Sequence, residues 1–236
     1  MEKFLLLDIE GTISPIDFVH KKLFPLAYER MESFVKENFH LLQDEVLRLA
    51  QEAEDDKDYP MEFISTDPAS VTAFLRHQIN HDRKTTVLKD IQGRIWQAAY
   101  EKGEVKSEIF ADVRPFLEDW TGKGNLVSIF SSGSIKAQKV FLRHTDSGNL
   151  SPFITDYFDT TYGGKKEPAS YKKILSVMKR DKGIFVSDIV EELEAAKQGG
   201  FSPILCIRKG NTIQKENSFP SISQLDEIWN LKENSE

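Results

Sequence analysis

Short apolar runs that each end at a polar residue constrain the fold of this chain most strongly. The runs cover residues 3–7, 126–130, 184–186 and 204–207. Asp8 and Ser131 directly follow the first two runs, and Asp188 comes after Ser187 at the end of the third. Asp112 is placed to cap a helix before the second run, and Ser134 is placed to cap one after it. Runs this short predict buried strands, and helical patterns separate them in the second half of the chain. This alternation predicts an α/β fold with a doubly wound parallel sheet.

A long helical segment interrupts that alternation after the first strand. Within 69–81 and 84–101, apolar residues recur at helical spacing, and an acidic, proline-containing stretch over 51–68 predicts a loop. We therefore predict a Rossmann-like catalytic core formed by residues 1–16 and 109–236. Residues 17–108 form a helical cap inserted after the first strand. We expect the cap over the carboxyl end of the sheet, where ligands of such folds bind.

Composition narrows the possible partners. The chain has 38 acidic and 31 basic residues and a net charge of −7, which argues against nucleic-acid binding. No apolar stretch approaches the length of a membrane span, so we predict no membrane contact. Cys206 is the single cysteine and lies in an apolar run, which predicts a buried side chain and fits a cytoplasmic protein. We predict a monomer, with a frayed tail after Leu231.

Polar residues at the strand ends suggest a catalytic site, because all carboxyl ends of a parallel sheet lie on one edge. A magnesium ion held by carboxylates would reduce the repulsion between a phosphate ester and an Asp8 nucleophile. Glu10 can protonate the leaving oxygen and then deprotonate water. Ser131 and Lys165 can hold the phosphate oxygens, and Asp188 can complete the metal shell. Each residue alone is typical of a turn or a cap. Their joint placement at strand ends favours a magnesium-dependent phosphatase.

These residues also resemble a known superfamily. The run DIEGT (8–12) resembles the first motif of the haloacid-dehalogenase-like hydrolases, and Ser131, Lys165 and Asp188 resemble the other three motifs. The superfamily pattern has Asp two residues after the nucleophile, whereas this chain has Glu10. With Glu10 at this position and Pro15-Ile16 shortly after it, the segment resembles the enolase-phosphatase (acireductone synthase) family. The similarity continues through 82–86, 88–89, 92–93, 96, 110–113, 131–134, 158–160 and 164–165.

The resemblance implies a substrate and a set of roles. The substrate is 2,3-diketo-5-methylthiopentyl 1-phosphate, a small phosphorylated metabolite of methionine salvage, which is enolised and then dephosphorylated to acireductone. Asp8, Glu10 and Asp188 are implied to bind one Mg²⁺ per chain. Glu10 could do so through its backbone carbonyl, which would leave its side chain for acid–base work. Ser131, Ser132 and Lys165 are implied to bind the substrate phosphate.

Several alternatives stay open from the sequence. Glu192, one helical turn after Asp188, could support the metal shell or could be a solvated acid. The core motifs also allow a phosphatase for another small phosphorylated metabolite. A dehalogenase needs neither Glu10 nor Asp188, and an inactive scaffold should have lost one of the motif residues. His77 and His81 are spaced like some zinc ligands, but no Cys or acidic partner completes a set.

Overall fold

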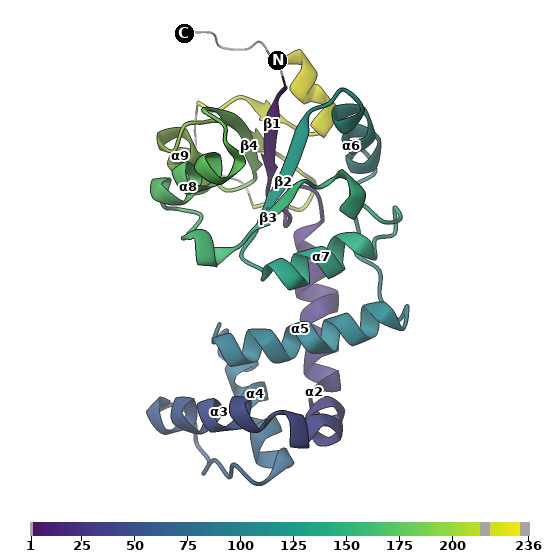
Figure 1. The fold of residues 1–236 in the computed structure, drawn as a ribbon. Coiled ribbons are helices and arrows are strands. Elements are labelled where there is room, and N and C mark those ends of the chain that lie inside the picture. The colour runs from purple at the N-terminus through teal and green to yellow at the C-terminus, as the bar shows by residue number, and fades with distance from the viewer. Residues whose placement is uncertain (1, 213–217, 232–236) are drawn as a thin grey trace. The chain divides into compact units, whose positions relative to one another are not determined.

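The chain forms two compact units in this computed structural model, which describes residues 2–212 and 218–231. One unit, here the core, comprises Met1–Val19 and Val105–Glu236, and the other, here the helical unit, comprises His20–Glu104. Figure 1 shows the path of the chain through both. The sequence placed the boundaries after residues 16 and 108. The role of the helical unit as a cap stays a prediction, as does its place over the sheet.

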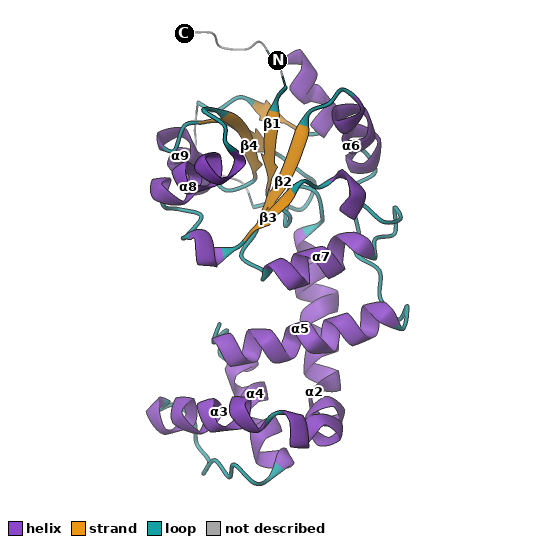
Figure 2. Cartoon of the chain, viewed as in Figure 1, coloured by secondary structure: helices purple, strands orange, loops and turns teal. Residues whose placement is uncertain are grey.

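A parallel sheet organises the core, and the predicted α/β fold class is confirmed. Among the described residues its strand order is β3-β2-β1-β4-β5-β6, and every neighbouring pair is parallel. The strands are β1 (Phe4–Leu7), β2 (Leu126–Phe130), β3 (Asp156–Phe158), β4 (Gly183–Ser187), β5 (Phe201–Cys206) and β6 (Ser221–Ile222). Since β1 pairs with both β2 and β4, the residues after these three strands meet at one edge of the sheet (Figure 2).

Helices cover both faces of the sheet, which explains why its central strand is uniformly apolar. All four residues of β1 are buried. Helices α8 (Pro168–Met178) and α9 (Val190–Gln198) lie over one face, and α6 (Val113–Gly122) and α7 (Ile135–Arg143) lie over the other (Figure 1). A strand with helices on both sides has no solvent face, so it needs no polar alternation.

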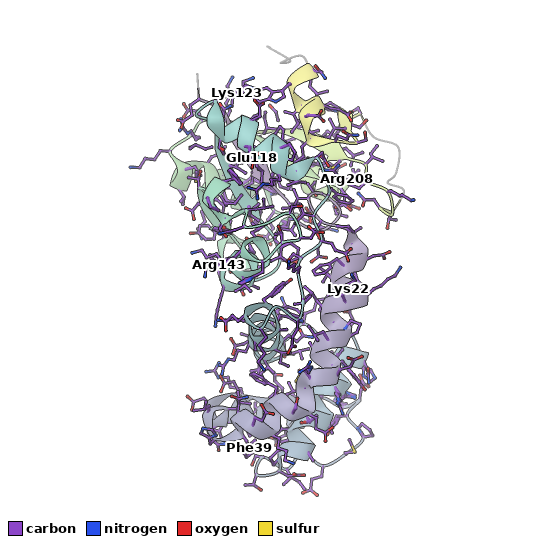
Figure 3. The ribbon with its side chains drawn as sticks, turned by 90° about the vertical axis from the view of Figure 1, so that its right-hand side faces the viewer. Lys22, Phe39, Glu118, Lys123, Arg143 and Arg208 are labelled. Carbon is purple, nitrogen blue, oxygen red and sulfur yellow. The ribbon has the colours of Figure 1, made fainter. Side chains whose placement is uncertain are left out.

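The helical unit has a hydrophobic interior of its own, formed between its helices. Its helices are α2 (Phe24–Asn38), α3 (Gln43–Asp55), α4 (Pro68–Asn80) and α5 (Thr86–Glu101). The short helix α1 (Ile16–Phe18) of the core is followed by a π-helical turn (Val19–Leu23) that leads into α2; Figure 3 labels Lys22 within this turn and Phe39 just after α2. Asp67 caps α4 by accepting from the backbone of Ala69 and Ser70. Helices predicted over 69–81 and 84–101 are thus confirmed.

The structure corrects two local predictions, the loop over 51–68 and the capping role of Asp112. The loop predicted over 51–68 is wrong in its first part, since α3 continues to Asp55. Asp112 stands at the start of α6 but makes no side-chain capping bond; its carboxylate instead pairs with Arg208. Cys206 is buried, as predicted. The tail expected to fray after Leu231 lies outside the described residues. None of the described helices has the length and apolarity to cross a membrane.

Candidate active site

Asp8 stands at the carboxyl end of the central strand. Its backbone N–H donates to the Val186 carbonyl at 3.0 Å, so the pairing of β1 with β4 continues up to this residue. The side chain is buried, with 5% of the residue exposed. A carboxylate in this position is fixed by the strand itself and not by a flexible loop, as a pre-organised nucleophile requires.

A tight turn, residues 9–14, follows Asp8 and carries Glu10. The backbone N–H groups of Thr12, Ile13 and Ser14 all donate to the Ile9 carbonyl, at 3.2, 3.0 and 3.0 Å. Glu10 is half-buried in this turn.

Gly11 explains why this turn cannot hold a larger residue at its third position. Its φ of +71° is a conformation that L side chains rarely adopt. A Cβ placed on Gly11 would lie 2.4 Å from Oδ2 of Asp188. The turn therefore packs its backbone directly against the Asp188 carboxyl group.

Lys165 joins Asp8 in a buried ion pair. Its Nζ lies 2.7 Å from Oδ1 of Asp8 and 2.7 Å from Oε2 of Glu192. The loop that carries Lys165 is fixed at its backbone, because the Tyr171 hydroxyl donates to the Lys165 carbonyl at 2.6 Å. Burial alone would lower the pKa of Lys165, but the carboxylates of Asp8 and Glu192 outweigh it and raise that pKa. Lys165 therefore stays an ammonium cation.

Glu192 belongs to this cluster, and its description as a solvated acid is wrong. It is 8% exposed and lies in the first turn of α9. Besides Lys165, it accepts a hydrogen bond from the Ser187 hydroxyl at 2.8 Å. The sequence predicted this proximity from the four-residue spacing of a helical turn, but Asp188 lies before α9 begins, in the loop after β4. The two carboxylates are close because α9 starts directly after that loop, and the charge of Glu192 helps to raise the pKa of Asp188.

Negative charge exceeds positive charge around Lys165. Asp188 is 3% exposed, and burial raises its pKa to about 7, helped by the carboxylates of Asp8 and Glu192 and opposed by Lys165. Burial likewise raises the pKa of Asp8 and of Glu192. A buried group of carboxylates is typical of a site that receives a cation or carries out acid–base chemistry.

The chemistry of these donors fits a hard divalent cation. In the part of the chain that the structure describes, no three His, Cys, Asp or Glu side chains are arranged to hold a metal by themselves. Mg²⁺ does not require such a set, because it commonly uses one or two carboxylates and keeps waters and substrate phosphate oxygens as further ligands. Asp8 and Asp188 supply two buried carboxyl groups whose raised pKa values a nearby cation would reverse.

The loop after β2 brings hydroxyl and backbone groups to the same edge. Ser131 is buried, its N–H donates to the Phe158 carbonyl at 3.2 Å, and its Oγ accepts from Gly133 N–H at 3.3 Å. Gln138 donates its side-chain N–H to the Gly133 and Phe158 carbonyls at 2.7 and 2.9 Å. Ser132 is exposed. Hence the loop is rigid around Ser131, while Ser132 faces solvent.

The structure thus brings the predicted residues together to different degrees. Asp8 and Lys165 are in direct contact, and Asp188 lies against the turn that carries Glu10. Ser131 follows the neighbouring strand, β2. Sequence reasoning missed the supporting contacts, among them the Asp159 carboxylate, which accepts from the N–H groups of Ile135 and Thr161 at 3.1 and 3.0 Å. Asp159 directly follows β3, so its place at a strand end was the available signal, but that place does not show which N–H groups its carboxylate accepts from.

Comparisons with known proteins show what this chain is similar to. A family model described as haloacid dehalogenase-like hydrolase matches residues 3–200. The enolase-phosphatase E1 of Leptospira interrogans is 40% identical over 227 residues, which cover 95% of this chain and 96% of that protein. The enolase-phosphatase E1 of Synechococcus elongatus is 40% identical over 235 residues, with 95% and 96% covered. The crystal structure of the UTR4 protein of Saccharomyces cerevisiae matches with a TM-score of 0.73 and 28% identity, covering 96% of this chain and 99% of that one.

Proposed function

This chain belongs to the haloacid dehalogenase-like hydrolases and, within them, to the enolase-phosphatase family, and from this premise we propose that it is the bifunctional enolase-phosphatase of methionine salvage. Its substrate is 2,3-diketo-5-methylthiopentyl 1-phosphate. It enolises this compound and then hydrolyses the phosphate ester to give acireductone, 1,2-dihydroxy-3-keto-5-methylthiopentene. The observation that supports this most directly is the buried contact of Asp8 with Lys165 at the sheet edge that Asp188 shares.

Asp8 is the nucleophile in the proposed phosphoryl transfer. Its carboxylate oxygen forms a bond to phosphorus while the bond from phosphorus to the leaving oxygen breaks, which gives an aspartyl-phosphate. Lys165, already 2.7 Å from Asp8, places its positive charge where negative charge spreads over the phosphoryl oxygens. The hydroxyl and backbone groups at Ser131 and Ser132 hold the same oxygens. Attack in line is possible because the end of β1 holds Asp8 in place.

Glu10 moves the protons in this scheme. Its carboxyl group donates a proton to the leaving oxygen in the first step. The resulting carboxylate accepts a proton from water in the second step, as that water attacks the aspartyl-phosphate and releases inorganic phosphate and free Asp8. The turn over 9–14 keeps Glu10 two residues from the nucleophile, within the same rigid segment.

One Mg²⁺ ion is the proposed cofactor, and the family generally uses this ion. Asp8, Asp188 and either the side chain or the backbone carbonyl of Glu10 would hold it. When bound, it supplies positive charge that reduces the repulsion between the carboxylate of Asp8 and the phosphate, and it polarises a carbonyl for enolisation. We further propose that the chain works as a cytoplasmic monomer without nucleic-acid or membrane partners; size-exclusion chromatography with light scattering tests the monomer.

A stopped-flow product assay tests the proposed function. The diketo phosphate is mixed with the protein with and without Mg²⁺, and ultraviolet absorbance of the conjugated enol is followed together with inorganic phosphate. We expect absorbance to rise before phosphate appears, and both to require Mg²⁺. If phosphate appears first or alone, the protein is a plain phosphatase and the enolase assignment is wrong.

A variant at Lys165 separates the two reactions. Lys165→Ala removes the charge needed when the phosphoryl group is transferred, so we expect enolisation to persist while phosphate release falls on the order of 10²-fold. Lys166→Ala is the matched control, because Lys166 is the adjacent lysine and is exposed. Equal loss of both reactions in Lys165→Ala would contradict the separation.

A further inference from the structure

The loop after β5 contacts the turn that carries Glu10 at two consecutive backbone carbonyls. Asn211 donates its Nδ2–H to the Gly11 carbonyl at 2.9 Å. Arg208 (labelled in Figure 3) donates its Nε–H to the Thr12 carbonyl at 3.0 Å. Gly11 and Thr12 are the two residues directly after Glu10. Side chains from a segment nearly two hundred residues away therefore hold the turn immediately beside the proposed acid–base group.

Arg208 is itself held rigidly. Its Nη1 and Nη2 each donate to an oxygen of Asp112 at 2.8 Å, and Nη1 also donates to the Ser223 carbonyl at 2.7 Å. The residue is 7% exposed, and the guanidinium lies 4.4 Å from the centre of the Phe110 ring. A buried, bidentate arginine–carboxylate pair has a fixed geometry, so the position of Arg208 is determined by the core.

The same turn is also fixed on its other sides. The Phe110 N–H donates to the Ile13 carbonyl at 3.1 Å, and the Gly11 N–H donates to the Ser14 carbonyl at 2.8 Å. Since Gly11 packs against the Asp188 carboxyl group, a shift of the turn would change the direction of Glu10 and its separation from Asp188 together. A displacement of about 1 Å at a reacting group can reduce a rate on the order of 10²-fold.

We propose that Asn211 and Arg208 are positioning residues that aim Glu10 at the leaving oxygen of the substrate. This inference rests on the proposed function, because it takes Glu10 as the general acid. The proton that Glu10 donates goes to the oxygen whose bond to phosphorus breaks. A phosphate ester with a good leaving group, such as 4-nitrophenyl phosphate, departs as a stable anion and needs little protonation. An alkyl phosphate needs that proton, so misdirecting Glu10 slows its cleavage selectively.

Asn211→Ala against Asn125→Ala is the matched test. Asn125 is also half-buried, and it accepts from the Lys3 N–H at 2.9 Å, just before β1 and thus at the opposite end of that strand. The measured quantity is kcat/KM for 4-nitrophenyl phosphate and for butyl phosphate with Mg²⁺, because kcat/KM reports steps up to departure of the leaving group. For Asn211→Ala we expect a loss on the order of 10-fold with butyl phosphate and less than about 2-fold with 4-nitrophenyl phosphate. For Asn125→Ala we expect equal changes with both substrates.

Two further variants keep each failure distinguishable. Glu10→Gln should show the same selectivity, on the order of 10²-fold. If Glu10→Gln is selective but Asn211→Ala is not, the positioning role is wrong and the proposed function stands. If Glu10→Gln slows both esters equally, Glu10 is not the general acid. The general-acid role in the proposed function and the positioning role of Asn211 and Arg208 are then both wrong. Arg208→Lys retains a positive charge beside Asp112 and so avoids an unpaired buried carboxylate. It should match Asn211→Ala in selectivity, and an equal loss on both esters overturns the role of Arg208.

Discussion

The core and the helical unit each hold carboxylates away from solvent, buried in the core and half-buried in the helical unit, but they differ in how much positive charge accompanies them. In the core, Asp8 and Glu192 share Lys165, and Asp188 adds a further carboxyl group whose pKa is raised to about 7. In the helical unit, Asp56 lies 3.4 Å from Arg83 and 3.3 Å from Nε2 of His77.

The pKa values follow this difference. Burial would raise the pKa of Asp56, but the Asp58 N–H, Arg83 and His77 outweigh it and lower that pKa. The helical unit thus pairs its half-buried carboxylate with positive charge and a backbone N–H, whereas the core leaves buried carboxylates in excess. Uncompensated buried charge lowers stability, and proteins tolerate it mainly at functional sites. The comparison therefore points to the core as the place of chemistry and assigns the Asp56 cluster to structure.

Asp8→Asn should have the largest effect. The amide has nearly the same shape, but it is a poor nucleophile and a poor metal ligand. We expect turnover of the diketo phosphate to fall at least about 10⁴-fold, with an unchanged far-ultraviolet circular dichroism spectrum. Phosphate release under saturating substrate measures this. Substantial activity in a folded variant would remove Asp8 from the role of nucleophile.

Removal of the metal should come next. Because the core has excess negative charge at Asp8 and Asp188, we expect EDTA to reduce phosphate release at least about 10²-fold and Mg²⁺ to restore it. Ca²⁺ should not restore it, since calcium prefers more ligands at longer distances. A titration of activity against free Mg²⁺ measures this effect, and full activity after exhaustive chelation would contradict it.

The sequence predicts which residues share a site better than it predicts which atoms contact each other. Strand ends in a parallel sheet share an edge, so Asp8, Ser131 and Asp188 could be expected at one site from strand periodicity alone. The periodicity does not show which oxygen faces which nitrogen, so the contact of Lys165 with Glu192 emerged only in the structure. The acidic partner of His77 was missed because Asp56 lies just after α3, in the predicted loop over 51–68, and helical spacing says nothing about contacts between a loop residue and a distant helix.

Asp188→Asn should stabilise the metal-free protein at neutral pH. With a pKa of about 7 in the folded state and an ordinary value of 3.8, Asp188 binds more proton in the folded than in the unfolded state between these values. Stability therefore falls as pH rises from about 4 to 7. An asparagine at position 188 stays neutral, so the stability of the variant does not fall in this way as pH rises. In EDTA at pH 8 we therefore expect the variant to be more stable than the unsubstituted protein, by on the order of 2 kcal/mol.

Thermal unfolding between pH 4 and pH 8 measures the difference between the two proteins. Glu194→Gln is the control for loss of one negative charge, since Glu194 is an exposed acid on the same helix, α9. The advantage of Asp188→Asn should disappear near pH 4. In the presence of Mg²⁺ the variant should require more metal for activity. An advantage that does not depend on pH would mean that the core is not short of positive charge.

Asp56→Asn should have the smallest effect of these changes. It should lower the stability of the protein, whereas Asp188→Asn should raise it. The lowered pKa of Asp56 means that its charged form is favoured in the folded state, so its contribution is present above the ordinary value of 3.8 and is lost as pH falls through the folded pKa. Asparagine can still accept the Asp58 N–H, which lies 3.0 Å from Oδ1, so the substitution removes mainly the charge. We expect Asp56→Asn to destabilise the protein by about 1 kcal/mol at pH 7, with a deficit that shrinks in acid.

Asp58→Asn provides the control for this last effect. Asp58 also pairs with Arg83, at 2.9 Å, but its side chain is 68% exposed, against 11% for Asp56. Solvent and salt screen an exposed pair, so we expect Asp58→Asn to change stability by less than about 0.5 kcal/mol and to lose even that in 1 M salt. Urea unfolding from pH 3.5 to 7, followed by circular dichroism, measures both variants. If Asp56→Asn stabilises the protein at pH 7 as Asp188→Asn does, both regions carry excess negative charge, and charge balance no longer separates the site of chemistry from the scaffold.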